Sequence, residues 1–99
     1  MLVLNCQMKS SVEKRKWIRK APERTRVEIN AGPKPMLVVF EPLAQEFSLD
    51  AWGKIYLDLP LGDLKDLGLT AWDTGVSIWL PNTSGHFVRD ADGNVICEL

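Results

Sequence analysis

From Arg26 to the C-terminus, apolar and polar side chains alternate in short runs that are separated by turns rich in proline and glycine. Residues 26–30 read RVEIN and residues 54–59 read KIYLDL, so that every second side chain is apolar. A period of two is typical of a strand that buries one face and exposes the other. This pattern predicts an all-β protein.

About seven short segments have this strand character, at intervals near ten residues. They are residues 26–30, 36–40, 46–49, 54–59, 75–80, 86–89 and 94–99. Such spacing favours a small antiparallel β-sandwich or barrel over alternating strands and helices. We expect residues 26–40 to form a hairpin through AGPKP, and the last three segments to form a β-meander. The stretch LGDLKDLGL, residues 61–69, predicts one or two helical turns.

The chain length of 99 residues suits one hydrophobic core. A hydrophobic share of 45% and a charged share of 25% are ordinary for a globular domain, and the apolar runs are too interrupted for a membrane span. We therefore expect a single β-domain over residues 26–99, preceded by an arm over residues 1–25. The opening MLVLNC is too short an apolar run for a signal peptide, which favours a cytoplasmic location.

The N-terminal arm is strongly basic. Residues 1–26 contain eight Lys or Arg and two Glu, a net charge of +6, whereas residues 27–99 contain four basic and eleven acidic residues, a net charge of -7. Ser10 and Glu13 have capping-box spacing, which predicts a short helix over residues 11–20 that ends before Pro22.

Three interpretations of this arm stay open. It could contact nucleic acid, with a tryptophan stacking on a base and basic side chains on phosphates, through Lys14, Arg15, Lys16, Trp17, Arg19 and Lys20. It could be a solvated tail, as runs of like charge commonly are. It could also lie on an acidic face of its own body or of a neighbouring subunit.

Residues 72–81, WDTGVSIWLP, resemble the active-site strand of pepsin-like aspartic proteases. The resemblance implies that Asp73 is a catalytic carboxylate and Ser77 its hydroxyl neighbour. Because that chemistry needs two carboxylates that share a proton, a chain with one such motif would have to dimerise. Only 26 residues follow Asp73, and the segment from Gly75 to Trp79 is one residue shorter than in those proteases. We therefore interpret Asp73-Thr74-Gly75 as the turn that begins a strand.

A second resemblance concerns VVFEPLAQEFSL and the following GKIYLDL. The stretch from Val27 to Val95 resembles small uncharacterised bacterial all-β proteins that share a strand running into Glu-Pro. The resemblance implies a compact β-sandwich and transfers no site residue.

Metal and cofactor sites are not expected. DADGN at residues 90–94 begins like a calcium-binding EF-hand loop, but Val95 stands where that loop needs glycine, so we interpret it as a tight hairpin turn. Cys6, Cys97 and the single His86 lack the paired spacing of zinc ligands. We expect His86 in a loop or at the start of a strand. In the absence of a signal peptide we expect Cys6 and Cys97 to be free thiols, and the alternative is a disulfide between them in an oxidising compartment.

The four tryptophans are numerous for so short a chain. Trp72 and Trp79 flank or lie in predicted strands, which favours packing, whereas Trp52 beside Gly53 stays open as a binding residue. Tyr56, on the polar face of its strand, is a second candidate. Stacking on sugars or bases is the alternative role for exposed rings.

These observations together predict a non-enzymatic binding or interaction domain whose partner is a protein or a second copy of the chain. Edge strands such as RVEIN need cover, and a homodimer would supply it. The alternatives are a nucleic-acid-contacting protein that uses the basic arm and a dimeric aspartic protease centred on Asp73.

Overall fold

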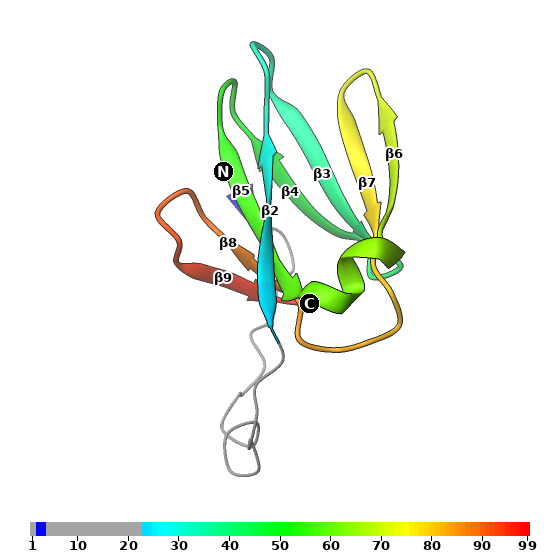
Figure 1. Ribbon diagram of the computed structural model, residues 1–99. Helices are drawn as coiled ribbons and strands as arrows, with labels where there is room; N and C mark the ends of the chain where they lie inside the picture. The colour runs from blue at the N-terminus through cyan, green and yellow to red at the C-terminus, as the bar shows by residue number, and fades with distance from the viewer. Residues whose placement is uncertain (1, 4–22) are drawn as a thin grey trace.

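The computed structural model, which describes residues 2–3 and 23–99, is a β-sandwich. One sheet has five strands, in the order β1 (Leu2–Val3), β4 (Gln45–Leu49), β3 (Met36–Glu41), β7 (Gly75–Trp79) and β6 (Gly68–Trp72). The other has four, in the order β2 (Arg24–Asn30), β5 (Lys54–Pro60), β8 (Phe87–Arg89) and β9 (Val95–Glu98). The predicted all-β sandwich is confirmed (Figure 1).

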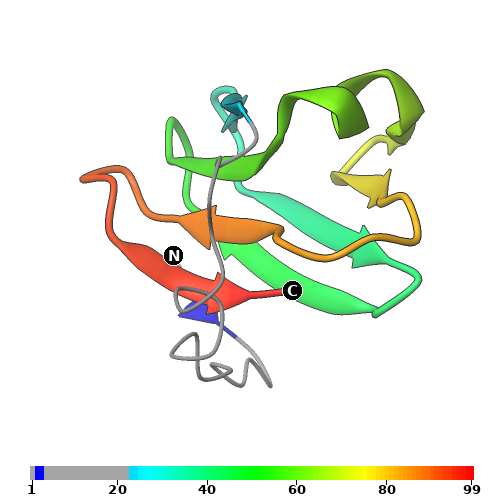
Figure 2. The same cartoon turned by 60° about the horizontal axis from the view of Figure 1, so that its bottom comes forward.

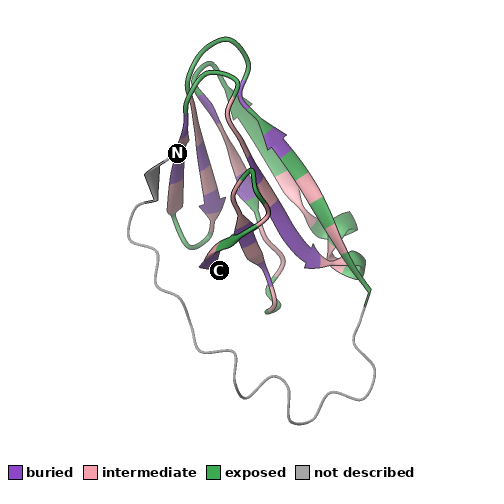
Figure 3. Ribbon diagram, turned by 90° about the vertical axis from the view of Figure 1, so that its left-hand side faces the viewer, coloured by how far each residue is buried: buried purple, intermediate pink, exposed green. Residues whose placement is uncertain are grey.

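The core lies between the two sheets and is built by the alternation that the sequence displays. Phe40 of β3 and Phe47 of β4 are fully buried and meet edge to face, with ring centroids 5.7 Å apart. They face a row from β5 that is equally buried, namely Ile55, Leu57 and Leu59. Buried positions recur along the strands of both sheets, whereas the turns are exposed (Figure 3).

Two predicted connections are wrong. The segments at residues 26–30 and 36–40 do not form a hairpin, because β2 belongs to the four-stranded sheet and β3 to the five-stranded sheet. The last three segments do not form a meander, because β7 pairs in parallel with β3 and only β8 and β9 form a hairpin. Alternation specifies which face of a strand is buried, but such a strand can pair in either sheet.

The hairpin of β8 and β9 confirms the turn interpretation of DADGN, and Figure 2 shows it in orange and red beside β5. The stretch LGDLKDLGL is helical only in its first part. A 3-10 helix, η2 (Leu61–Asp66), is followed after Leu67 by β6, a strand that the sequence analysis missed. The predicted helix over residues 11–20 lies outside the described residues.

Cys97 is disulfide-bonded, and the described part of the chain contains no free cysteine. The expectation of two free thiols is therefore wrong, because it was drawn from the cellular compartment and not from geometry. The other cysteine of the sequence, Cys6, lies outside the described residues. Within residues 2–3 and 23–99, no helix has the length and apolar character needed to cross a membrane.

Candidate functional site

Four turns gather at one end of the sandwich, which we call the turn end. They are residues 31–35, 50–53, 73–74 and 90–94, between β2 and β3, β4 and β5, β6 and β7, and β8 and β9. The strand register requires this, because Asn30 pairs with Lys54 and Met36 pairs with Leu49. Figure 1 shows three of these turns at the top and the fourth at the left. Turns held by a rigid sheet scaffold are a common place for binding residues.

Trp52 occupies the turn between β4 and β5 with its side chain in solvent. The residue is 74% exposed, and its backbone is left-handed, with φ +62°. Its N–H donates to the carbonyl of Gly32, and the N–H of Ala31 donates to the carbonyl of Gly53, both at 2.8 Å. Glycine or asparagine would take this conformation at lower cost. The indole buries little area, so stability does not account for tryptophan at this position.

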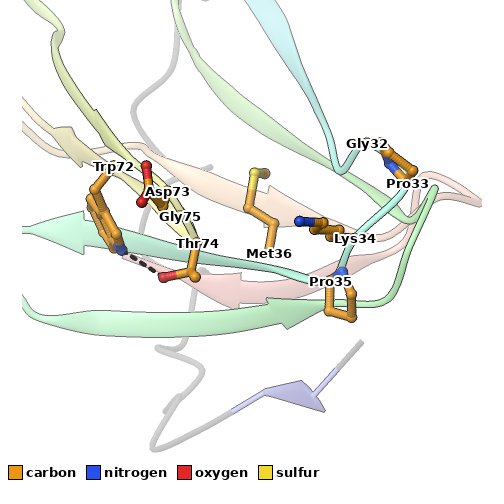
Figure 4. A pocket seen from close by; sticks show the side chains of 9 residues that line it. All are labelled: Gly32, Pro33, Lys34, Pro35, Met36, Trp72, Asp73, Thr74 and Gly75. Atoms are coloured by element: carbon orange, nitrogen blue, oxygen red, sulfur yellow. Dashed lines mark hydrogen bonds between the residues drawn. The ribbon is translucent and has the colours of Figure 1, made fainter.

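A hollow of about 240 Å³ lies between the β2–β3 turn and the β6–β7 turn (Figure 4). Trp72 forms one wall, and its Nε1–H donates to Thr74 Oγ1 at 3.0 Å, which fixes the indole against the turn. Met36 and Lys34 line the other side. The hollow is therefore lined by an aromatic wall, a thioether, one cation and the carboxylate of Asp73.

A second hollow, of about 230 Å³, lies between the β4–β5 turn and the β8–β9 turn. Asp50, Asp90 and Asp92 line it together with Lys54. Asp90 is engaged locally, because its Oδ1 accepts the N–H groups of Asp92 and Asn94 at 3.0 and 2.9 Å. This side chain closes the hairpin turn, which is an ordinary role for aspartate in turns.

Asp73 and Thr74 are the two turn residues of the β6–β7 hairpin, and Gly75 begins β7. The interpretation of Asp73-Thr74-Gly75 as a turn is therefore confirmed. Asp73 is exposed, and Ser77 lies within β7 opposite Thr70. The dimeric protease stays an untested prediction.

His86 belongs to a cluster that the sequence analysis missed. It directly precedes β8 and is only 2% exposed, and its Nε2 lies 2.9 Å from Asp63 Oδ2. The Thr83 hydroxyl donates to the same oxygen at 2.6 Å and lies 3.3 Å from the same ring nitrogen. The Thr83 hydrogen bond lowers the pKa of Asp63, burial opposes this, and contact with His86 lowers it further.

This geometry differs from that of a nucleophilic triad. In a triad the imidazole separates the hydroxyl from the carboxylate, because each of them bonds to a different ring nitrogen. Here the hydroxyl and the carboxylate share Nε2 of His86. The cluster is suited to holding the loop of Thr83 against η2, because Asp63 of η2 contacts both Thr83 and His86.

A second polar cluster covers the outer face of the four-stranded sheet. Asp58 is 5% exposed and accepts hydrogen bonds from Arg24 Nε and Arg89 Nε, both at 2.8 Å. Burial alone would raise the pKa of Asp58, but the hydrogen bonds and charges of Arg89 and Arg24 outweigh it and lower the pKa. The Arg24 guanidinium also donates to the Gly85 carbonyl and the Arg89 guanidinium to the Gly93 carbonyl, so this ion-pair cluster anchors two loops to the sheet.

The predicted site residues are placed as follows. Tyr56 lies on this same outer face, half-buried, with Lys54 Nζ 5.7 Å and the Arg26 guanidinium carbon 5.9 Å from its ring centroid. Trp52 lies at the turn end, so the two candidates belong to different surfaces. The basic candidates and Trp17 lie outside the described residues: Lys14, Arg15, Lys16, Trp17, Arg19 and Lys20.

Comparison with protein-family models, with curated proteins and with solved structures found no match. Within residues 2–3 and 23–99, no three His, Cys, Asp or Glu side chains are grouped so that they could hold a metal ion. Residues 23–99 carry six basic and twelve acidic side chains, so their net charge is -6.

Proposed function

We propose that the protein is a non-enzymatic binding domain that contacts a protein partner through the turn end, with Trp52 as the central contact. The exposed Trp52 indole on a left-handed backbone carries the proposal. Tryptophan is among the residues that most often dominate protein interfaces, because a large rigid ring loses little entropy on binding. A role in contacting a partner explains why tryptophan occupies a left-handed position that glycine or asparagine would take at lower cost.

The charge of the turn end favours a cationic partner surface. Asp50, Asp73, Asp90 and Asp92 oppose Lys34 and Lys54, and two positive charges minus four negative charges leave -2. Lysine or arginine on the partner would be attracted by this charge and could also lie over the Trp52 ring. The two flanking hollows are of a size to receive single side chains.

Quantitative affinity capture from the native host tests the proposal. Three baits are compared: the wild-type chain, Trp52→Asn, which retains the turn conformation, and Leu43→Asn, which removes an exposed apolar side chain from the β3–β4 turn at the other end. We expect a partner that wild type and Leu43→Asn retain and Trp52→Asn loses. Calorimetry with the purified partner should then give an affinity at least tenfold weaker for Trp52→Asn. If every captured protein binds all three baits equally, the proposal fails.

Nucleic-acid binding through the basic segment is the competing function. The acidic body opposes it, since a net charge of -6 over residues 23–99 repels phosphate. It predicts an affinity for single-stranded oligonucleotides that falls steeply with added salt. Salt-sensitive oligonucleotide binding that is unchanged in Trp52→Asn would favour this competitor over the proposed function.

A further inference from the structure

The strand β6 is an edge strand of the five-stranded sheet, at the end opposite β1. It pairs with β7 on one side and with no other strand of the described chain. Leu69, Thr70, Ala71 and Trp72 are all exposed, and Leu69 reaches 68% exposure. We propose that β6 pairs with β6 of a second copy of this chain, antiparallel and with Thr70 opposite Thr70, to make one continuous sheet across the dimer. The inference does not rest on the proposed function.

The backbone of β6 offers the groups that such pairing needs. Thr74 directly precedes β7, and its carbonyl accepts from Leu37 N–H of β3; Leu80 directly follows β7, and its N–H donates to the Glu41 carbonyl of β3. The even-numbered residues of β7 therefore also direct their backbone groups toward β3. Odd-numbered residues of β7 therefore bond to β6, and their partners there are Thr70 and its even-numbered neighbours. Leu69 and Ala71 consequently direct their N–H and C=O groups away from β7, toward the open edge.

With a two-fold axis at Thr70, the outward N–H and C=O groups of Leu69 and Ala71 all form hydrogen bonds across the dimer. Leu69 then lies opposite Ala71 of the second copy, and Ala71 lies opposite Leu69. Each of these two pairs exchanges both of its backbone hydrogen bonds, which gives four bonds across the dimer. The Thr70 pair falls at a position without hydrogen bonds, where side chains approach most closely.

Side-chain size is also complementary in this register. On the outer face, Gly68 lies opposite Trp72 of the second copy, and the other neighbour of Gly68 in the row is Trp79. Each row across the dimer therefore reads Trp79, Gly68, Trp72, Gly75, so that every tryptophan lies beside glycine. On the inner face, the exposed Leu69 meets the small Ala71. A shift of one residue would lose both fits.

Charge distinguishes β6 from β2, one of the two edge strands of the four-stranded sheet. β2 presents Arg24, Arg26, Glu28 and Asn30 in solvent, and charged side chains of this kind protect edge strands from pairing. Residues 68–72, GLTAW, contain no charge and no proline. Self-association, which the sequence analysis placed at RVEIN, is therefore better placed at β6. The complementarity of β6 to itself favours a second copy over an unrelated peptide.

The proposed pairing also bears on Asp73. Three residues separate Asp73 from Thr70, so six residues along the paired strands separate the two Asp73 positions. At a rise of about 3.4 Å per residue they stand about 20 Å apart. Carboxylates at this separation cannot share a proton, so this dimer and an aspartic protease dimer are mutually exclusive.

Sedimentation velocity on the full chain tests the proposal. A five-residue strand pair is a small interface, below about 1,200 Å², so we expect a reversible dimer with a Kd on the order of micromolar. Thr70→Lys places two cations opposite each other and should weaken the dimer at least tenfold, and Thr70→Glu should do the same with two anions. An equimolar mixture of these two variants should recover the dimer as a heterodimer.

Two controls make the outcome decisive. Near-ultraviolet circular dichroism and the melting temperature show whether each variant is folded, and recovery in the mixture shows it independently. Asn30→Lys places the same charge on β2 and should leave the dimer unchanged. The proposal is overturned if the wild type is monomeric at about 500 µM, if Thr70→Lys and Asn30→Lys act alike, or if mixing restores no dimer.

Discussion

The indole of Trp72 lies over Gly75, its cross-strand partner at the turn of the β6–β7 hairpin. A side chain at position 75 would begin 2.8 Å from Trp72 Cζ2 and would also meet the backbone oxygen of Leu37 in β3. At the other end of the hairpin, Trp79 pairs with Gly68, where an added carbon would lie at an ordinary contact distance of 3.4 Å from Trp79 Cβ. Lack of space, and not turn conformation, requires glycine at position 75.

Gly75→Ala should therefore lower the free energy of unfolding by about 1–3 kcal/mol, because the added carbon overpacks the junction of β3, β6 and β7. The matched control is Gly62→Ala in η2, where an added carbon has no atom within 4 Å. Urea denaturation of both variants measures the difference. Equal stability of Gly75→Ala and wild type would contradict this account of the Trp72 contact.

The fold class was predictable because burial of one strand face imposes a period of two on the sequence. RVEIN and KIYLDL became β2 and β5, with Ile29, Ile55 and Leu57 buried as the alternation requires. The strand β6 was not predictable in this way. GLTAW is an edge strand with its inner face largely uncovered, so its sequence lacks a buried alternation, and the preceding leucines have helical spacing.

The site was less predictable than the fold. Trp52 was left open as a binding residue because it lies in a predicted turn beside Gly53, but its left-handed backbone was visible only in the structure. Asp63 and His86 are 23 residues apart in sequence, and no local sequence pattern predicts their contact. Clusters that form across sheets depend on topology, which periodicity does not specify.

Trp52→Asn should leave the free energy of unfolding unchanged or raise it by up to about 1 kcal/mol, because asparagine tolerates the left-handed conformation and little buried area is lost. Thermal denaturation measures this. A loss above about 1 kcal/mol would mean that the indole stabilises the fold, and would remove the argument for a contact role.

Asp58→Asn should destabilise the protein by about 2–4 kcal/mol at pH 7, because it leaves Arg24 and Arg89 without their shared carboxylate. The lowered pKa of Asp58 in the folded state means that its stabilisation is complete above the ordinary value near 3.9 and is lost as the pH falls through the lowered folded value. The difference between wild type and Asp58→Asn should therefore shrink on acidification below about pH 4.

Denaturation at a series of pH values measures this difference. Asp66→Asn is the control, since its carboxylate is exposed and pairs only with the exposed Lys65 among the described residues. Surface pairs of this kind contribute little, so this variant should follow the wild type at every pH. A stability difference for Asp58→Asn that does not change between pH 7 and pH 2 would contradict a stabilising role for the Asp58 ion pairs with Arg24 and Arg89.

Thr83→Val should raise the pKa of Asp63, because the hydroxyl that donates to Asp63 Oδ2 is its largest stabilising contact. It should also lower the free energy of unfolding by about 1 kcal/mol. Carbon-detected NMR titration of the Asp63 carboxyl measures the first effect, and Ser84→Ala, an exposed change in the same loop, is the control. An unshifted titration would show that the Thr83 hydroxyl does not bond to Asp63 in solution.

Cys97→Ser should lower the free energy of unfolding by about 2–4 kcal/mol under oxidising conditions, because it removes the disulfide. Dithiothreitol should lower the free energy of unfolding of the wild type by a similar amount and leave that of Cys97→Ser unchanged. The disulfide also bears on location, because disulfides persist in oxidising compartments and are rare in the cytoplasm, where the sequence analysis placed the protein. Alkylation of intact cells followed by mass spectrometry measures the redox state of Cys97 in place. A fully alkylated Cys97 thiol would favour the cytoplasm, and a protected one would contradict that prediction.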